Sequence, residues 1–95
     1  MEDKQHILTL YIAGKTQKAV RAIENINQYC DEHLRDGYIL EVVDLEAHPE
    51  KAASDQIIAV PTLIKKLPVP IRILVGDLSD KEKVLVGLNI KTAQA

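Results

Sequence analysis

The most informative stretch of the chain is Val60-Pro61-Thr62-Leu63, in which an apolar residue and Pro-Thr lead into an apolar run. Upstream of it, residues 7–13 form a short apolar segment that ends at a glycine, which predicts a buried strand. Residues 16–34 carry apolar side chains at three- and four-residue steps, which predicts a helix. A second strand is predicted over 38–45 and a weak helix over 50–58. The order before the proline is therefore strand, helix, strand, helix.

The predicted helix over 16–34 has one packed stripe and one polar face. Asp36-Gly37 closes it, with the glycine as a left-handed cap. Two strands joined by a helix of this length predict a right-handed parallel unit, and Glu41 and Asp44 predict that the second strand has a partly exposed edge. The residues of the expected stripe are Ala19, Val20, Ile23, Ile26, Cys30 and Leu34.

From Thr62 onward, two further strands are predicted, over residues 62–67 and 71–75. Pro68-Val69-Pro70 separates them and predicts an extended, rigid connection, because proline cannot sit in a central ladder. Ser79-Asp80-Lys81-Glu82 is a capping box, which predicts a helix that starts at Asp80.

Residues 84–90 fit two kinds of structure. As a strand, the segment has apolar side chains at alternate positions, with Gly87 and Asn89 on the opposite face. As a helix, it presents Val84, Leu85 and Leu88 on one side, although glycine and asparagine are poor helix formers. Local physics leaves the choice open.

Composition excludes several classes of protein. The chain has 95 residues, enough for one domain, and is 46% hydrophobic but only 3% aromatic, so its core must be aliphatic. Few aromatics and a net charge of -2 argue against nucleic-acid binding. No apolar run approaches the roughly 20 residues of a membrane span. The polar start at residues 1–5 and the single cysteine fit a soluble cytoplasmic domain.

This pattern resembles the thioredoxin architecture. The resemblance implies the order strand-helix-strand-helix-strand-strand-helix (βαβαββα), an α/β fold, and a cis peptide before Pro61, although trans is the default for such a bond. The redox members carry C-x-x-C at the first strand-to-helix turn, which here reads Ala13-Gly14-Lys15-Thr16. We therefore expect a binding protein with no catalytic residues rather than an enzyme.

The chain also resembles the KaiB family of circadian clock proteins, over about residues 6–90. The run 76–88 is long and specific, and the long acidic C-terminal tail of the family is missing, so we expect one KaiB-like domain over 1–95. The matching segments are 10–14, 20–22, 43–45, 59–63, 67–70 and 76–88.

The resemblance implies a fold-switching regulator without a cofactor. KaiB-type proteins rest in a form with a rearranged C-terminal half (βαββααβ), as a homo-oligomer, commonly a tetramer. They switch slowly to a thioredoxin-like monomer that docks on the KaiC ATPase and modulates its phosphorylation cycle. The segment that local physics leaves open, residues 84–90, is a strand in one form and a helix in the other.

The same resemblance implies the site residues. Lys65, Pro70 and Arg72 match positions that face a KaiC-like ATPase, whereas Gln56 and Ile73 replace basic residues there, which weakens the charge complementarity. The positions that balance the two folds are Gly76, Asp77, Gly87 and Asn89, the last standing where aspartate is usual.

Two departures concern other partners. His6 replaces an aromatic residue, and Glu41 replaces a lysine on the edge strand that pairs with KaiA in cyanobacteria, which argues against KaiA binding. The sensor domain of the clock kinase SasA has a related thioredoxin-like shape, and the resemblance also implies a SasA-like histidine kinase as a further partner class. These departures suit a reduced, KaiC-centred timer or stress system.

Several residues that could have a function are explained as well or better by a purely structural role. Cys30 on an apolar stripe is better explained as a buried thiol than as a redox sensor, and three scattered histidines predict no metal site. The acidic residues near Asp77 and the cations near Lys18 read as solvated faces. Two other functions stay open: a thioredoxin-like oxidoreductase acting through Cys30, and an adaptor of a two-component stress pathway without KaiC contact.

Overall fold

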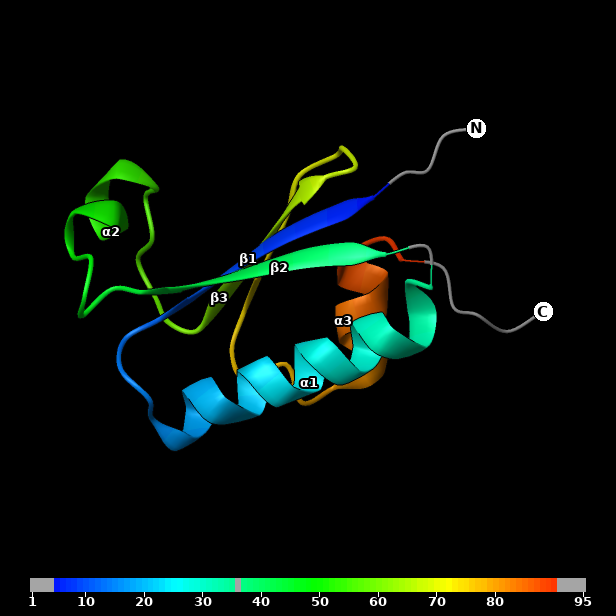
Figure 1. The fold of residues 1–95 in the computed structure, drawn as a ribbon, viewed down its shortest axis with the longest axis horizontal. Helices are drawn as coiled ribbons and strands as arrows, with labels where there is room; N and C mark the ends of the chain where they lie inside the picture. The colour runs from blue at the N-terminus through cyan, green and yellow to red at the C-terminus, as the bar shows by residue number, and fades with distance from the viewer. Residues whose placement is uncertain (1–4, 36, 91–95) are drawn as a thin grey trace.

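The computed structural model describes residues 5–35 and 37–90. The polar start at residues 1–4 and the contribution of Asp36 to the helix end lie outside the described residues. The order of elements is the βαβαββα order that the thioredoxin resemblance implies (Figure 1). The elements are β1 (His6–Ile12), α1 (Gln17–His33), β2 (Tyr38–Asp44), α2 (Glu50–Ser54), β3 (Thr62–Leu67), β4 (Arg72–Val75) and α3 (Lys81–Gly87).

The four strands form one sheet in the order β2-β1-β3-β4. β1 pairs with β2 in parallel, as predicted for two strands joined by a helix, and it pairs with β3 antiparallel. β3 and β4 form an antiparallel hairpin. β2 is an outer strand, which agrees with its predicted exposed edge.

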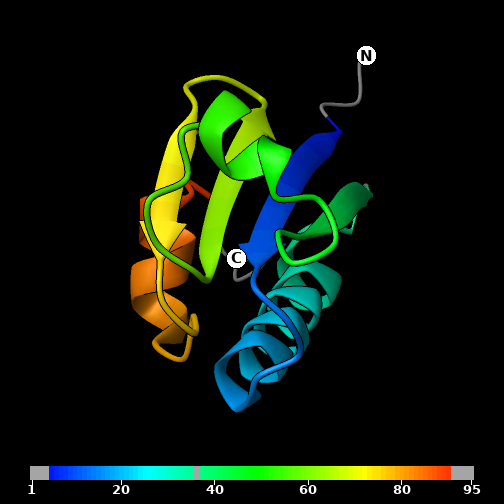
Figure 2. The ribbon, with the colours of Figure 1, turned by 90° about the vertical axis from the view of Figure 1, so that its left-hand side faces the viewer.

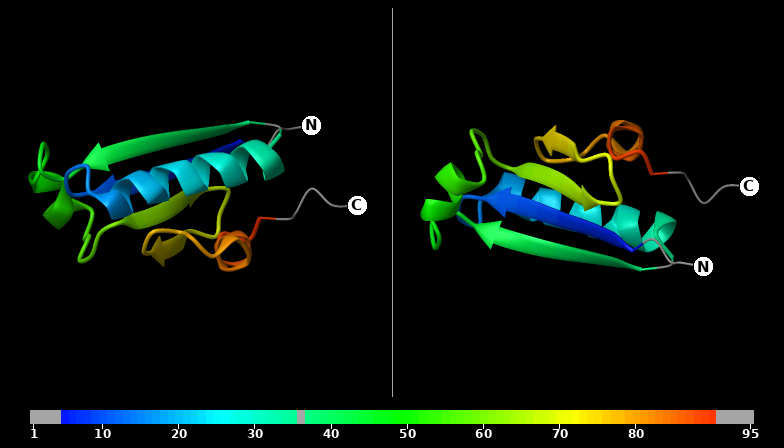
Figure 3. Two further views of the ribbon diagram at one scale, coloured as in Figure 1. Left: turned by 90° about the horizontal axis from the view of Figure 1, so that it is seen from below. Right: turned by 90° about the horizontal axis from the view of Figure 1, so that it is seen from above.

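The two faces of the sheet differ in their cover. α1 and α3 pack on one face, which we call the helix face, and α2 lies on the other, the open face (Figure 2). The core lies between the helix face and the two helices, and it contains Leu8, Leu10, Ile26, Leu63 and Leu85. The right panel of Figure 3 looks onto the open face, which is largely uncovered, with α1 behind the strands.

α1 begins where the sequence predicts, with Thr16 as its N-cap: Thr16 Oγ1 accepts a hydrogen bond from Ala19 N at 3.0 Å. The predicted stripe is wrong at Val20, which is 41% exposed. Ala22 and Tyr29 are buried instead. Each helical residue turns about 100° from the last, and Val20 falls outside the arc of the helix that contains the buried residues Ala19, Ala22, Ile26, Tyr29 and Cys30.

Three boundaries differ from the predictions. α2 ends at Ser54 rather than near residue 58, because Gln56 has a φ of 59°, outside the right-handed helical region. Residues 68–71 form a tight reversal rather than an extended connection, since β3 and β4 are antiparallel neighbours whose adjacent ends they must join. The N-cap of α3 is Asp80, one residue later than the capping box predicts: its carboxylate accepts from Lys83 N at 3.2 Å.

In residues 5–35 and 37–90, no helix combines the length and the hydropathy that a bilayer span requires. The same part of the chain holds no group of three or more His, Cys, Asp or Glu side chains placed to bind a metal ion.

Candidate functional site

Two cations lie side by side on the helix face. Lys65 of β3 is the register partner of Arg72 of β4, so their side chains leave the sheet on the same side. Lys65 also pairs with Leu8 of β1, a core residue, which places the lysine among apolar side chains. Lys65 is only 1% exposed, whereas Arg72 is exposed.

No counter-charge for the pair is found among residues 5–35 and 37–90. Within the described residues, neither side chain forms a hydrogen bond or an ion pair, although the chain as a whole is acidic. Burial, and next the charge of Arg72, lower the pKa of Lys65. Like charges directly opposite each other destabilise a sheet, so this pair costs stability and is a candidate for function.

The other two predicted partner-binding residues lie elsewhere. Pro70 is exposed in the hairpin turn next to Arg72. Gln56 lies on the open face, where it lines a pocket with Ile64 and Ile73, on the far side of the sheet from Lys65. The structure therefore brings Lys65, Pro70 and Arg72 to one end of the β3-β4 hairpin and separates Gln56 from them.

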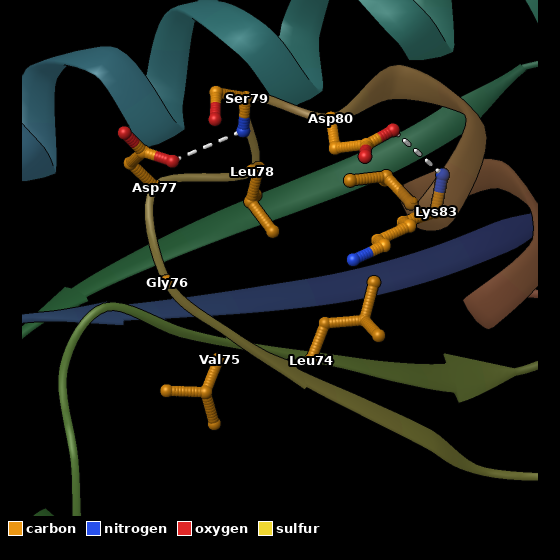
Figure 4. A pocket seen from close by; sticks show the side chains of 9 residues that line it. Leu74, Val75, Gly76, Asp77, Leu78, Ser79, Asp80 and Lys83 are labelled. Carbon is orange, nitrogen blue, oxygen red and sulfur yellow. Dashed lines mark hydrogen bonds between the residues drawn. The ribbon is translucent and has the colours of Figure 1, made fainter.

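The first two predicted fold-switch residues stand in the loop between β4 and α3. This loop borders a pocket of about 250 Å³ between Leu74, Leu78 and Val84 (Figure 4). Gly76 has a φ of 119°, a conformation that suits glycine. Asp77 accepts a hydrogen bond from Ser79 N at 3.1 Å, and hydrogen bonding to Ser79 is the main cause of a lowered Asp77 pKa.

Side chains from α1 hold this loop, and sequence reasoning missed them. Tyr29 Oη donates to Leu78 O at 2.8 Å, and Asn25 Nδ2 donates to Asp77 O at 3.0 Å. One turn further along α1, Glu32 accepts from Lys81 Nζ at 2.7 Å. The sequence does contain a signal: Asn25, Tyr29 and Glu32 can form hydrogen bonds and are spaced four and three residues apart, on one side of the helix. It was missed because these residues were in part assigned to the polar, solvent-facing side of the helix.

The other two fold-switch residues end α3. Asn89 has a φ of 58° and follows the C-cap residue Leu88. Asn89 N donates to Val86 O at 3.0 Å and Ile90 N donates to Leu85 O at 2.9 Å, the pattern of a Schellman motif. Both Leu85 and Ile90 are buried in the core, which supplies the apolar contact of that motif. Asparagine is thus used here for its tolerance of the left-handed region.

The turn that carries C-x-x-C in redox enzymes has no thiol here. It borders a pocket of about 380 Å³ with Val60 and Pro61, and the Val60–Pro61 peptide bond is cis. The single cysteine, Cys30, lies on α1 in the core, where burial raises its pKa to about 12. A thiol in that state is a poor nucleophile, so this turn does not support disulfide chemistry through Cys30.

Sequence comparison places the chain among clock proteins. Residues 9–90 match the family model described as the KaiB domain. The chain is 45% identical over 87 residues to the circadian clock oscillator protein KaiB of Cyanothece sp., covering 92% of this chain and 83% of the relative. It is also 45% identical to the protein of the same description from Synechococcus elongatus, covering 92% and 85%.

Structural comparison gives the same fold class. The N-terminal domain of Synechococcus elongatus SasA has a TM-score of 0.65 at 20% identity, covering 90% of this chain and 83% of that one. Fasciola hepatica thioredoxin has a TM-score of 0.70 at 15% identity, covering 92% and 81%. At these identities the likeness shows the shared thioredoxin-like fold alone. By its sequence match over residues 9–90, the chain belongs to the KaiB family of circadian clock proteins.

Proposed function

We propose that this protein is a non-enzymatic timing regulator that binds a KaiC-like ATPase after a slow change of fold and modulates its phosphorylation cycle. The observation that carries the proposal is the family match over residues 9–90, with 45% identity to KaiB relatives. The identity of the partner comes from the family resemblance.

The geometry supports a binding role in two ways. The cations Lys65 and Arg72 lie at one end of the β3-β4 hairpin without a counter-charge among the described residues, an arrangement that an acidic partner surface would compensate. The cysteine is buried and the C-x-x-C turn carries no thiol, which weighs against the oxidoreductase alternative.

The mechanism that we propose is a population shift. The structure has the thioredoxin-like arrangement, in which residues 81–87 are the helix α3. If a second, resting arrangement of the C-terminal half predominates in solution and the ATPase binds only the thioredoxin-like one, the apparent affinity falls by the fraction of competent molecules. Slow conversion would then set the delay between mixing and binding.

The test mixes the protein with the KaiC-type ATPase of its own organism and ATP, and follows the complex by native mass spectrometry over hours. We expect slow complex formation that Gly87→Ala accelerates, because alanine favours the helical form of residues 84–90. The control is Val86→Ala, a neighbouring change at an exposed position of α3. Because it raises helix propensity too, it should also accelerate complex formation if propensity is the cause.

Each outcome has a distinct meaning. Rapid binding by the unmodified protein would keep the ATPase as partner and remove the slow switch. Absence of a complex in every phosphorylation state of the ATPase would overturn the proposal. Recovery of a histidine kinase instead of an ATPase in a pull-down would favour the two-component adaptor.

A further inference from the structure

β4 has an open edge. It is the outer strand of the sheet on the side away from β2, and both panels of Figure 3, which look onto the two faces of the sheet, show it at the border. Outer strands present unpaired backbone groups, and proteins usually protect them with charges, prolines or covering segments. The four residues of β4 contain a single charge, that of Arg72.

The register identifies which backbone groups of β4 are free. Gly76 N donates to Pro61 O at 2.9 Å, which continues the ladder beyond the pair Thr62–Val75. In an antiparallel ladder, hydrogen-bonded and non-hydrogen-bonded pairs alternate. Leu74 and Arg72 therefore bond to β3, whereas the N–H and C=O groups of Ile73 and Val75 point outward. No hydrogen bond within the described residues occupies these outward groups.

Side chains alternate across the same edge. Ile73 and Val75 lie on the open face and are 61% and 63% exposed. Figure 4 shows Leu74 directed toward α3 and Val75 directed away from it. A pocket of about 240 Å³ adjoins these two exposed side chains on the open face and is lined also by Ile57 and Ile64. A strand added here would find apolar neighbours on one face and Arg72 on the other.

From these observations we propose that β4 binds an extended segment of a partner protein, which adds a fifth strand to the sheet and alternates apolar with acidic side chains. Its apolar side chains would pack beside Ile73 and Val75, and a carboxylate would lie beside Arg72 and near Lys65. The carboxylate would provide the counter-charge that the cation pair lacks within the described chain. This inference concerns the sheet edge and does not require the ATPase.

A second copy of this chain fits the edge less well. Two β4 strands paired about a twofold axis would bring two sets of Lys65 and Arg72 together, which like-charge repulsion opposes. The other outer strand, β2, is a poorer site for such a segment. On the open face it carries the charged residue Glu41, whereas β4 carries isoleucine and valine there. Its helix-face carboxylate, Asp44, already accepts hydrogen bonds from Gly14 N and Glu46 N.

The test uses a fluorescent, end-blocked peptide, Thr-Val-Glu-Val-Glu-Val-Thr, and a matched peptide with Lys in place of Glu. Binding is measured by fluorescence anisotropy, and the site is mapped by amide NMR shifts. We expect the Glu peptide to bind at least about threefold more tightly and to shift the amides of Ile73 and Val75. Arg72→Glu should reverse the preference, whereas the same charge change at exposed Lys18 should leave it unaltered.

Ile73→Pro removes an outward N–H without removing a hydrogen bond to β3, so it should weaken the binding of both the Glu and the Lys peptide. Equal binding of the two peptides, or amide shifts confined to β2, would overturn the proposal. Self-association that Ile73→Pro abolishes, seen by sedimentation without peptide, would assign the edge to a second copy and also overturn it. If Ile73→Pro fails to fold, the reversal by Arg72→Glu still decides.

Discussion

A Cβ atom built at Gly87 would lie 2.6 Å from Leu74 Cδ2, so the last residue of α3 is packed against the strand beneath it. Gly87→Ala should gain up to about 1 kcal/mol of helix propensity, but Leu74 must rotate to make room. We therefore expect the thioredoxin-like form to be favoured by less than the propensity difference. Urea unfolding and the populations of the two forms by NMR measure this.

A double-mutant cycle separates the two contributions. Leu74→Val shortens the side chain that Gly87→Ala would meet, so the pair should be more stable than the sum of the single changes. Val86→Ala, at an exposed neighbour on α3, should show no coupling to Leu74→Val. Additivity in the first cycle would show that the contact imposes no cost.

Asn89 ends α3 in a left-handed conformation, which predicts the order of stability of its variants. Asn89→Gly should be neutral or stabilising, whereas Asn89→Val should destabilise the thioredoxin-like form by about 1–2 kcal/mol. The measurement is the midpoint of urea unfolding at constant slope. A valine variant as stable as the glycine variant would contradict the Schellman end of this helix.

A substitution at Gly76 separates the effect of backbone conformation from that of steric contact. An added Cβ would meet nothing within 4 Å, yet its φ of 119° disfavours any L side chain. Gly76→Ala should therefore cost about 1–3 kcal/mol in unfolding free energy, although no atom clashes. Gly87→Ala is the opposite case, with a close contact and ordinary helical backbone. Equal effects of the two alanines would show that φ does not control the loop.

We expect Lys65 to lower the stability of the folded chain while it strengthens binding of an acidic partner. Lys65→Met should raise the unfolding free energy by about 1–3 kcal/mol, because it replaces a lysine that is only 1% exposed with an apolar side chain, and it should weaken binding of an acidic partner. Lys66→Met is the matched control, since this neighbour is exposed. Loss of stability in Lys65→Met would show that the amine is compensated in the folded chain.

The difference in unfolding free energy between Lys65→Met and the unmodified protein should depend on pH with a definite sign. The folded-state pKa of Lys65 lies below its unfolded value, so between the two values the unfolded chain binds the extra proton. Stability from this group therefore rises with pH through that window, and the cost of the charged lysine applies below it. The advantage of Lys65→Met should shrink as the pH rises toward the unfolded pKa of lysine. A difference that is constant or that grows with pH would contradict the assignment.

The tyrosine on α1 holds the loop before α3. Tyr29→Phe should lose about 1 kcal/mol, because Tyr29 Oη donates to Leu78 O, and it should speed amide exchange at residues 77–80. Tyr38→Phe is the control: Tyr38 Oη donates to Asp31 at 2.8 Å in an exposed position, remote from this loop in the hydrogen-bond network. Equal exchange in both variants would remove Tyr29 as a restraint.

Sequence determined much of the first half of the molecule. The helical period of the apolar residues defines α1, and a short apolar run is enough to indicate the buried strand β1. The ends of β1, α1 and β2 are therefore predicted to within a residue or so. The family resemblance located the hairpin cations and the loop glycine. It gave no indication that Lys65 is buried or that Gln56 lies on the opposite face, because burial depends on which strands become neighbours.

Residues 84–90 owe their conformation to tertiary contacts rather than to local sequence. Their alternating and helical patterns are nearly equivalent as local signals, and Gly87 and Asn89 weaken the helix. In the structure, Leu85, Leu88 and Ile90 all reach the core beside β4 and α1, and the backbone ends in a hydrogen-bonded left-handed turn. Long-range burial supplies the free energy that local propensity lacks, so residues 84–87 become the last part of α3 where the sheet and α1 are there to cover it.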